Sequence, residues 1–126
     1  MNTATNKSIA SHQKALLHSQ RTMAIDFKDL RLNDIILIGT RNTCYSFVIT
    51  SERGMRGRLS GDSQNNFFPE AVLIGSLVKE GERVHMLMSR LEPLSHAMFF
   101  VRQGERLLEV LTSPITSLCF VRPLEE

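Results

Sequence analysis

From residue 25 onward, apolar and polar residues follow a period of two that is typical of β-strands. A β-branched apolar run at residues 34–39 ends at Gly39, and a run rich in aromatic and β-branched residues follows at 43–50. The short polar connection between these runs favours a β-hairpin. Further strands are expected at residues 56–60, 71–78, 83–91, 97–102, 106–112 and 115–122, separated by turns rich in Gly, Pro and charged residues.

This pattern predicts an all-β domain, a small barrel or sandwich of about seven or eight short antiparallel strands. One segment has an alternative: Val84, Met86 and Met88 alternate with polar residues, but Val84, Leu87 and Leu91 also fit the spacing of an amphipathic helix. The turn at residues 112–115, followed directly by the last apolar strand, resembles the turn before the final strand of SH3-like barrels. That resemblance covers only this turn and strand, and it implies neither a function nor a binding residue.

Residues 1–24 differ from the rest of the chain because they are polar and lack the period of two. Ile9, Leu16 and Leu17 fall on one face of a short helix. We therefore expect a tail at residues 1–24, either flexible or helical and docked on the body or on a partner chain. Residues 25–126 are expected to form a single β-rich domain.

Charge is unevenly distributed between the tail and the body. The tail carries Lys7, Lys14 and Arg21 and no acidic residue, whereas the remaining 12 basic residues are balanced by all 13 acidic residues. A nearly neutral body argues against a dedicated nucleic-acid-binding domain. The tail charges could still add nonspecific attraction to nucleic acid or to anionic lipid.

The cellular compartment is inferred from three features of the sequence. The N-terminus lacks the apolar segment of a secretory signal, and no apolar run approaches the about 20 residues of a membrane-spanning helix. Cys44 and Cys119 lie in separate apolar segments and are interpreted as buried thiols, with a disulfide as the alternative. Together these features favour a cytoplasmic protein without a membrane span.

Sequence motifs for catalysis or metal binding are not found in the chain. The histidines, His12, His18, His85 and His96, lack the HxxxH or HxH spacing that lets one element supply two metal ligands. No GxSxG elbow and no Walker loop occurs. We therefore predict no cofactor, no metal and no enzymatic activity, and a site built from Cys44 with His85 or His96 remains the catalytic alternative.

Three arginines form a basic segment in the first half of the domain. Arg56 and Arg58 share one strand face by the period of two, and Arg53 is close to them in sequence. Their guanidinium groups could hold a phosphate or another anion. With Lys7 and Lys14 they define an alternative function, the binding of nucleic acid or another anion. A charged edge strand that resists aggregation explains the same arginines without any ligand.

The leading hypothesis comes from the aromatic residues of the second half. Phe99 and Phe100 are adjacent, so one ring points inward and the other outward. An outward ring beside Leu107 or Leu111 would leave an apolar patch that needs a partner, although core packing on both sheet faces is the competing explanation. We therefore predict a non-catalytic module for protein interaction or self-assembly, with Phe99, Phe100, Leu107 and Leu111 contacting a protein partner or a second copy of the chain.

Overall fold

The computed structural model describes residues 22–62 and 67–124 of the chain. Most of the expected tail, including Lys7, Lys14 and the helix around Leu16, lies outside the described residues. The first described strand begins at Ile25. The prediction of a separate tail therefore stays a prediction.

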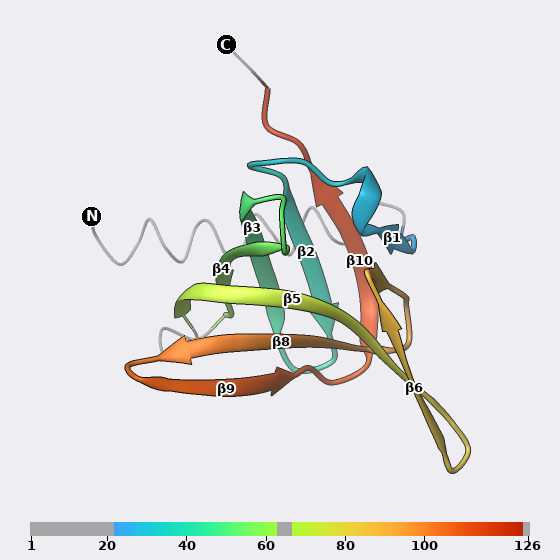
Figure 1. Ribbon diagram of the computed structural model, residues 1–126. Coiled ribbons are helices and arrows are strands. Elements are labelled where there is room, and N and C mark those ends of the chain that lie inside the picture. Colours follow the sequence, from blue (N-terminus) through green and yellow to red (C-terminus); the bar gives the residue numbers. More distant parts are fainter. Residues whose placement is uncertain (1–21, 63–66, 125–126) are drawn as a thin grey trace.

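Strands account for nearly all regular structure in the described part of the chain (Figure 1). Two very short strands, β1 (Ile25–Asp26) and β7 (Arg90–Leu91), pair with each other, and β1 leads into the 3₁₀ helix η1 (Phe27–Asp29). The other strands belong to one sheet: β2 (Ile35–Thr40), β3 (Cys44–Ser51), β4 (Arg56–Ser60), β5 (Phe67–Glu80), β6 (Arg83–Met88), β8 (His96–Gln103), β9 (Arg106–Leu111) and β10 (Ile115–Val121).

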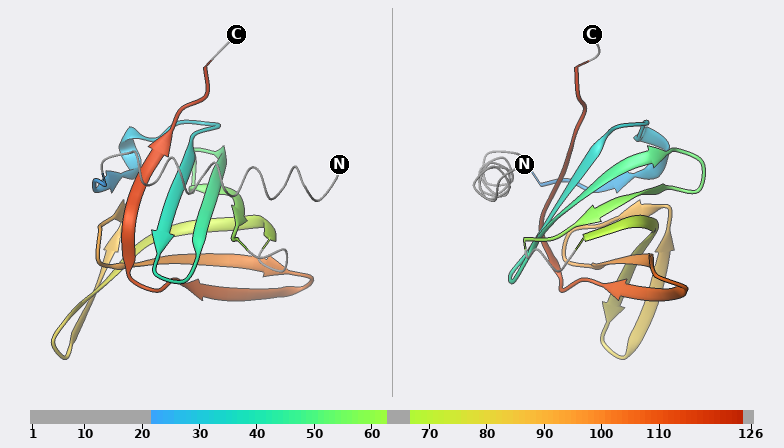
Figure 2. Two further views of the ribbon diagram at one scale, coloured as in Figure 1. Left: turned by 180° about the vertical axis from the view of Figure 1, so that it is seen from behind. Right: turned by 90° about the vertical axis from the view of Figure 1, so that its left-hand side faces the viewer.

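The large sheet folds over into two layers. Its order is β10–β2–β3–β4–β5–β8–β9, with β6 paired to β5, and the pairs among the described strands are antiparallel. β10, β2 and β3 run steeply across the direction of β5, β8 and β9 (Figure 1), and the two groups separate in the side view (Figure 2, right). β9 and β10 stand at the two ends of this order and do not pair with each other, so the barrel is not closed. The prediction of an all-β antiparallel domain is confirmed, and the open sandwich is the architecture that fits.

The hydrophobic core lies between the two layers. β2 contributes Ile36 and Ile38, and the rings of Phe47 from β3 and Phe99 from β8 have centroids 5.4 Å apart. All four side chains are fully buried. Because they come from both layers, their packing holds the layers together.

Residues 83–91 form two strands rather than a helix. β6 pairs with the end of β5, where Met86 lies opposite Leu77. Ser89 then adopts a left-handed conformation with φ 64°, which ends β6 before β7 begins. The strand expectation for this segment is confirmed, with a break that the period of two does not reveal.

The longest strand, β5, bends at a β-bulge. Leu73 lies opposite Phe99 whereas Gly75 lies opposite Met98, so Ile74 is the extra residue of the bulge. A Cβ added at Gly75 would lie 2.1 Å from a backbone oxygen of β6, so only glycine allows this close approach. Beyond the bulge, β5 and β6 form a hairpin that projects from the body (Figure 1).

A buried carboxylate ties the end of β10 to the loop before β2. Asp34 is fully buried and accepts hydrogen bonds from Nε and Nη2 of Arg122 at 3.0 and 2.9 Å. It also accepts the backbone N–H of Arg31 at 2.8 Å. Burial alone would raise the pKa of Asp34, but these hydrogen bonds and the charges of Arg122 and Arg31 hold this pKa below its usual value.

Candidate functional site

Alternate side chains of β8 point to opposite faces of the layer formed by β5, β8 and β9. Ala97, Phe99 and Val101 point into the core and are fully buried. Met98 and Phe100 point to the outer face and are half-buried. Of the two adjacent phenylalanines, Phe100 therefore occupies the outer face, and Phe99 is a core residue rather than part of a contact surface.

The strand register places further apolar residues around Met98 and Phe100. Val72 of β5 lies opposite Phe100, and Leu111 of β9 lies opposite Met98. Leu107 lies on the same side of β9 and is 65% exposed, while Leu111 is 40% exposed. We call this outer surface, formed by Val72, Met98, Phe100, Leu107 and Leu111, the β5–β8–β9 face.

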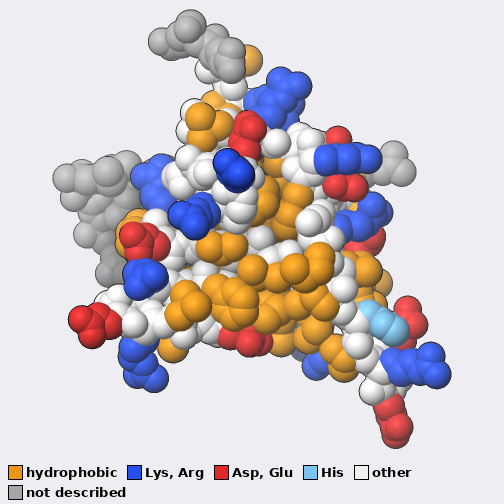
Figure 3. All heavy atoms as spheres, viewed as in Figure 1, with side chains coloured by type: hydrophobic (Ala, Val, Ile, Leu, Met, Phe, Trp, Pro, Cys, Tyr) orange, Lys and Arg blue, Asp and Glu red, His pale blue; other side chains and the backbone are white. Residues whose placement is uncertain are grey.

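Charged residues border the β5–β8–β9 face. At one end, Nε of Arg102 lies 3.2 Å from the carboxylate of Glu70. Phe100 also lies in a row of directly paired residues that crosses four strands. This row begins at Arg56 of β4 and ends at Glu109 of β9, so it has a charged residue at each end. In Figure 3, hydrophobic side chains gather over β5 and β8 while charged side chains lie mainly toward the periphery. An apolar centre with a charged border is typical of protein contact surfaces.

The apolar surface continues onto the hairpin of β5 and β6. Gly75 of β5 pairs with Met88 of β6 on one side and with Met98 of β8 on the other. Met86 of β6 pairs with Leu77, two residues further along β5. Met88 is exposed. The alternation in the sequence identified these methionines as one stripe, but the register that joins the stripe to the β5–β8–β9 face cannot be read from spacing alone.

The predicted anion-binding residues are only partly described by the structure. Arg53 lies in the turn between β3 and β4, and Arg56 and Arg58 lie on β4. All three are exposed, and none forms a salt bridge with another described residue. Lys7 and Lys14 fall outside the described residues, so the structure does not place them near the arginines.

The shared direction of Arg56 and Arg58 depends on the glycine between them. A Cβ added at Gly57 would lie 2.1 Å from the backbone oxygen of Val48 and 2.8 Å from the ring of Phe47. Gly57 therefore takes the inward position of β4, where the backbone approaches the core. Arg56 and Arg58 consequently share the outward side, as expected from the sequence.

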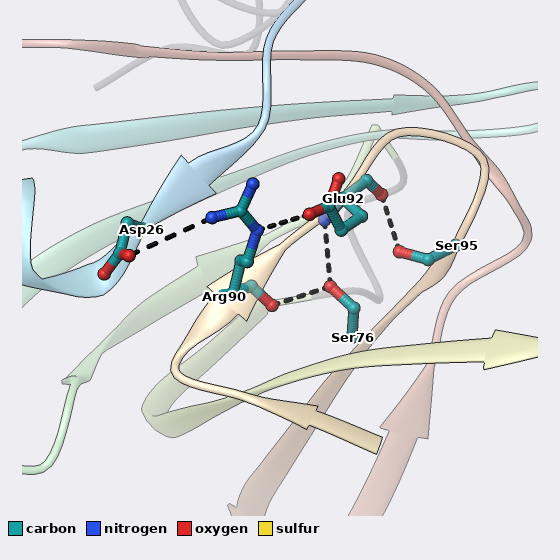
Figure 4. Close-up of polar contacts among 5 residues, drawn as sticks. All are labelled: Asp26, Ser76, Arg90, Glu92 and Ser95. Atoms are coloured by element: carbon teal, nitrogen blue, oxygen red, sulfur yellow. Dashed lines mark hydrogen bonds and ion pairs between the residues drawn. The ribbon is translucent and has the colours of Figure 1, made fainter. Parts of the chain in front are cut away.

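A polar network holds β7 against β5 (Figure 4). Ser76 is fully buried; its Oγ donates to the carbonyl oxygen of Arg90 at 2.7 Å and accepts the N–H of Glu92 at 3.0 Å. Ser95 Oγ donates to the carbonyl oxygen of Glu92 at 2.6 Å. The guanidinium of Arg90 contacts the carboxylate of Glu92 and lies 4.0 Å from that of Asp26. The hydrogen bond and charge of Glu92 raise the pKa of Arg90, with a smaller contribution from Asp26. The Ser76 hydroxyl is thus used for structure as both donor and acceptor.

The residues of the catalytic alternative lie on three different strands. Cys44 begins β3 and packs in a cluster with other apolar side chains. Nδ1 of His96 lies 2.7 Å from the carbonyl oxygen of Thr112, and Nε2 of His85 lies 3.9 Å from the carboxylate of Glu80 on the projecting hairpin. Within residues 22–62 and 67–124, no group of three or more His, Cys, Asp or Glu side chains could hold a metal ion.

Comparisons with known proteins do not assign this chain to a family. Searches against models of protein families, against curated proteins and against solved structures find no match. Among the residues that the structure describes, no helix has the length and apolar character needed to span a membrane. The candidate site therefore rests on the geometry of the chain itself.

Proposed function

We propose that this domain is a non-catalytic protein-binding module that uses the β5–β8–β9 face, either to self-associate or to bind another protein. One observation carries the proposal: the register places five apolar side chains on one outward sheet face, including Leu107 at 65% exposure. A contiguous apolar surface with a polar border is a recurrent feature of protein contact sites. The two exposed leucines stand at its margin, where a partner would remove them from water.

The position of β9 adds a second source of affinity. β9 ends the strand order of the large sheet, so one side of its backbone is not paired within the described residues. An edge strand presents N–H and C=O groups that another strand can extend. Pairing at β9 would extend the β5–β8–β9 face onto the partner, which favours self-association as the first outcome to test.

Light scattering coupled to size-exclusion chromatography tests this proposal over a range of protein concentrations. The expected result is a mass above that of the monomer that returns to the monomer mass in the variant Leu107→Glu/Leu111→Glu. Leu32→Glu is the matched control, because Leu32 is 52% exposed and lies in the loop before β2. Circular dichroism confirms that each variant keeps its strand content.

Two results would contradict the proposal. One is a wild-type chain that stays monomeric at high concentration and also retains no protein partner in affinity capture. The other is an assembly, or a captured partner, that persists unchanged in the Leu107→Glu/Leu111→Glu variant.

A second candidate function, the binding of nucleic acid or another anion, is favoured by the exposure of Arg53, Arg56 and Arg58 without carboxylate partners among the described residues. Three phosphate contacts predict that affinity for double-stranded DNA falls about 40-fold between 50 and 200 mM salt. Arg56→Gln/Arg58→Gln should weaken binding and flatten this salt dependence. A fluorescently labelled duplex that does not bind at low salt, or that binds the variant equally well, removes this candidate.

A further inference from the structure

The β5–β8–β9 face carries charges of opposite sign on its two margins. Arg56 of β4 and Glu109 of β9 are exposed, and neither side chain forms a hydrogen bond or an ion pair with another described residue. Adjacent strands lie about 4.8 Å apart, so the steps from β4 through β5 and β8 to β9 separate the two residues by about 14 Å. At this distance the two charges cannot pair within one copy, and salt largely screens them from each other.

The residues between these two charges are apolar. Val72 of β5 and Phe100 of β8 complete the row, whose order is cation, apolar, apolar, anion. Hydrophobic side chains accordingly gather over β5 and β8 in Figure 3. Such a row is complementary to its own reverse, because reversal sets the cation against the anion and one apolar residue against the other. The row therefore fits a second copy that is laid over it in the opposite sense.

The two neighbouring rows of the face have the same property. On one side, Glu70 of β5 and Arg102 of β8 form an ion pair with an N–O distance of 3.2 Å, so reversal sets each of them over the opposite charge. On the other side, the row ends in the exposed side chains of Met88 on β6 and Leu111 on β9, so reversal sets one apolar side chain over the other. Three successive rows are thus self-complementary under the same operation.

A two-fold axis that runs parallel to the strands, midway between β5 and β8, performs this reversal. It turns the second copy over, so that the two faces meet, and it keeps the strands of the two sheets aligned, as in packed sheets about 10 Å apart. An axis across the strands at the same row would instead set Arg56 against Arg56 and Glu109 against Glu109. Because like charges in contact oppose association, the charge pattern selects the axis parallel to the strands.

We propose that two copies of the chain stack through their β5–β8–β9 faces about this axis, with Arg56 of each copy paired to Glu109 of the other. Val72 of each copy packs on Phe100 of the other at the centre, and the two ion pairs close the margins. This inference rests on the proposed function, because it names the partner and the geometry for the same face. Pairing between two β9 edges is the competing geometry, and it would leave Arg56 three strands away from the contact.

Charge reversal tests the contact by light scattering coupled to size-exclusion chromatography over a range of concentrations. Arg56→Glu and Glu109→Arg each replace both ion pairs of the dimer by like charges, so each should raise the Kd of self-association at least about tenfold. The double variant Arg56→Glu/Glu109→Arg restores opposite charges and should return the Kd to within about threefold of the wild type. Arg41→Glu is the matched control, because Arg41 is exposed in the turn between β2 and β3, outside the face, and should leave the Kd unchanged.

Mixing the two single variants is the sharper measurement. In a heterodimer of Arg56→Glu with Glu109→Arg, both margins regain a pair of opposite charges, whereas each homodimer has like charges at both margins. Native mass spectrometry separates the three species, because the two substitutions change the mass in opposite directions. Heterodimers should therefore outnumber both homodimers in an equimolar mixture, and circular dichroism confirms that each variant keeps its strand content.

Three results would overturn the inference, and they separate it from the proposed function. A wild-type chain that stays monomeric at every concentration removes the stacked dimer, while a captured protein partner would leave the proposed function in place. A wild-type dimer that persists in both single variants but is lost in Leu107→Glu/Leu111→Glu self-associates in another geometry, such as pairing of β9 edges. Single variants that dissociate and do not form a heterodimer show that Arg56 and Glu109 do not meet across the contact.

Discussion

The hydroxyl of Ser76 satisfies two backbone groups that would otherwise be buried without a partner. Ser76→Ala removes its bonds to the carbonyl oxygen of Arg90 and to the N–H of Glu92 and changes little else in volume. Each buried polar group left unpaired costs about 1–3 kcal/mol. Because β7 is also held by the fully buried Leu91, the strand is expected to stay in place and to carry this cost. We therefore predict a loss of about 2–4 kcal/mol in the free energy of unfolding.

Urea unfolding followed by far-ultraviolet circular dichroism measures this loss, and the chain has no tryptophan for fluorescence. For a domain of this size, the same loss lowers Tm by about 10–20 °C. Ser113→Ala is the control, because Ser113 is half-buried and its side chain makes no hydrogen bond with another described residue. Its unfolding free energy should stay within about 0.5 kcal/mol of the wild type.

The reasoning is refuted if Ser76→Ala unfolds within about 0.5 kcal/mol of the wild type. It is also refuted if hydrogen exchange shows the N–H of Glu92 equally protected in the variant, because this amide would then have found another acceptor. A large loss of stability with unchanged protection at Glu92 would place the effect elsewhere in the core.

Three further predictions concern the interior and the ionisable groups. Gly57→Ala should destabilise the fold by more than about 3 kcal/mol or prevent folding, because the new Cβ would lie 2.1 Å from a backbone oxygen of β3; Gly81→Ala meets nothing within 4 Å and should cost only about 1 kcal/mol for its positive φ. Thr112→Val should cost about 1–3 kcal/mol in urea unfolding, since the buried hydroxyl accepts a backbone N–H at 2.9 Å and donates to a carbonyl oxygen at 2.8 Å. The lowered pKa of Asp34 means that the unfolded chain binds more protons near pH 4 than the folded one, so its stabilising contribution is complete above the ordinary value of 3.8 and is lost as the pH falls below it. Urea titrations from pH 7 to pH 3 should therefore show a decline that is smaller in Arg122→Met, and an equal decline in both proteins would contradict the assignment.

Local patterning predicted the strands and the side-chain directions within each strand. The alternation at residues 83–88 and the outward direction shared by Arg56 and Arg58 follow from a period of two, which depends only on backbone geometry. The adjacent pair Phe99 and Phe100 was expected to place one ring on each face. Which ring points inward could not be decided, because the two residues are identical and only pairing with β5 fixes the register.

Long-range pairing is what spacing cannot reveal. The candidate face needs Val72 opposite Phe100 and Leu111 opposite Met98, two contacts between segments more than ten residues apart in sequence. The bulge at Ile74 shifts this register by one residue, and such a shift leaves no mark in composition. The sequence therefore identified Phe100, Leu107 and Leu111 as candidates, while Val72 and the methionines of β6 became part of the same surface only in three dimensions.

The length of β5 makes the two layers thermodynamically inseparable. One continuous strand pairs with β4 over its first half, with β8 across its middle and with β6 at its end. Neither layer can melt without giving up hydrogen bonds that the other also needs, so the described domain should unfold as one cooperative unit. A cut in the backbone near the bulge would leave two fragments, each with an unfinished sheet and half of the interior, and neither would be expected to hold its shape alone.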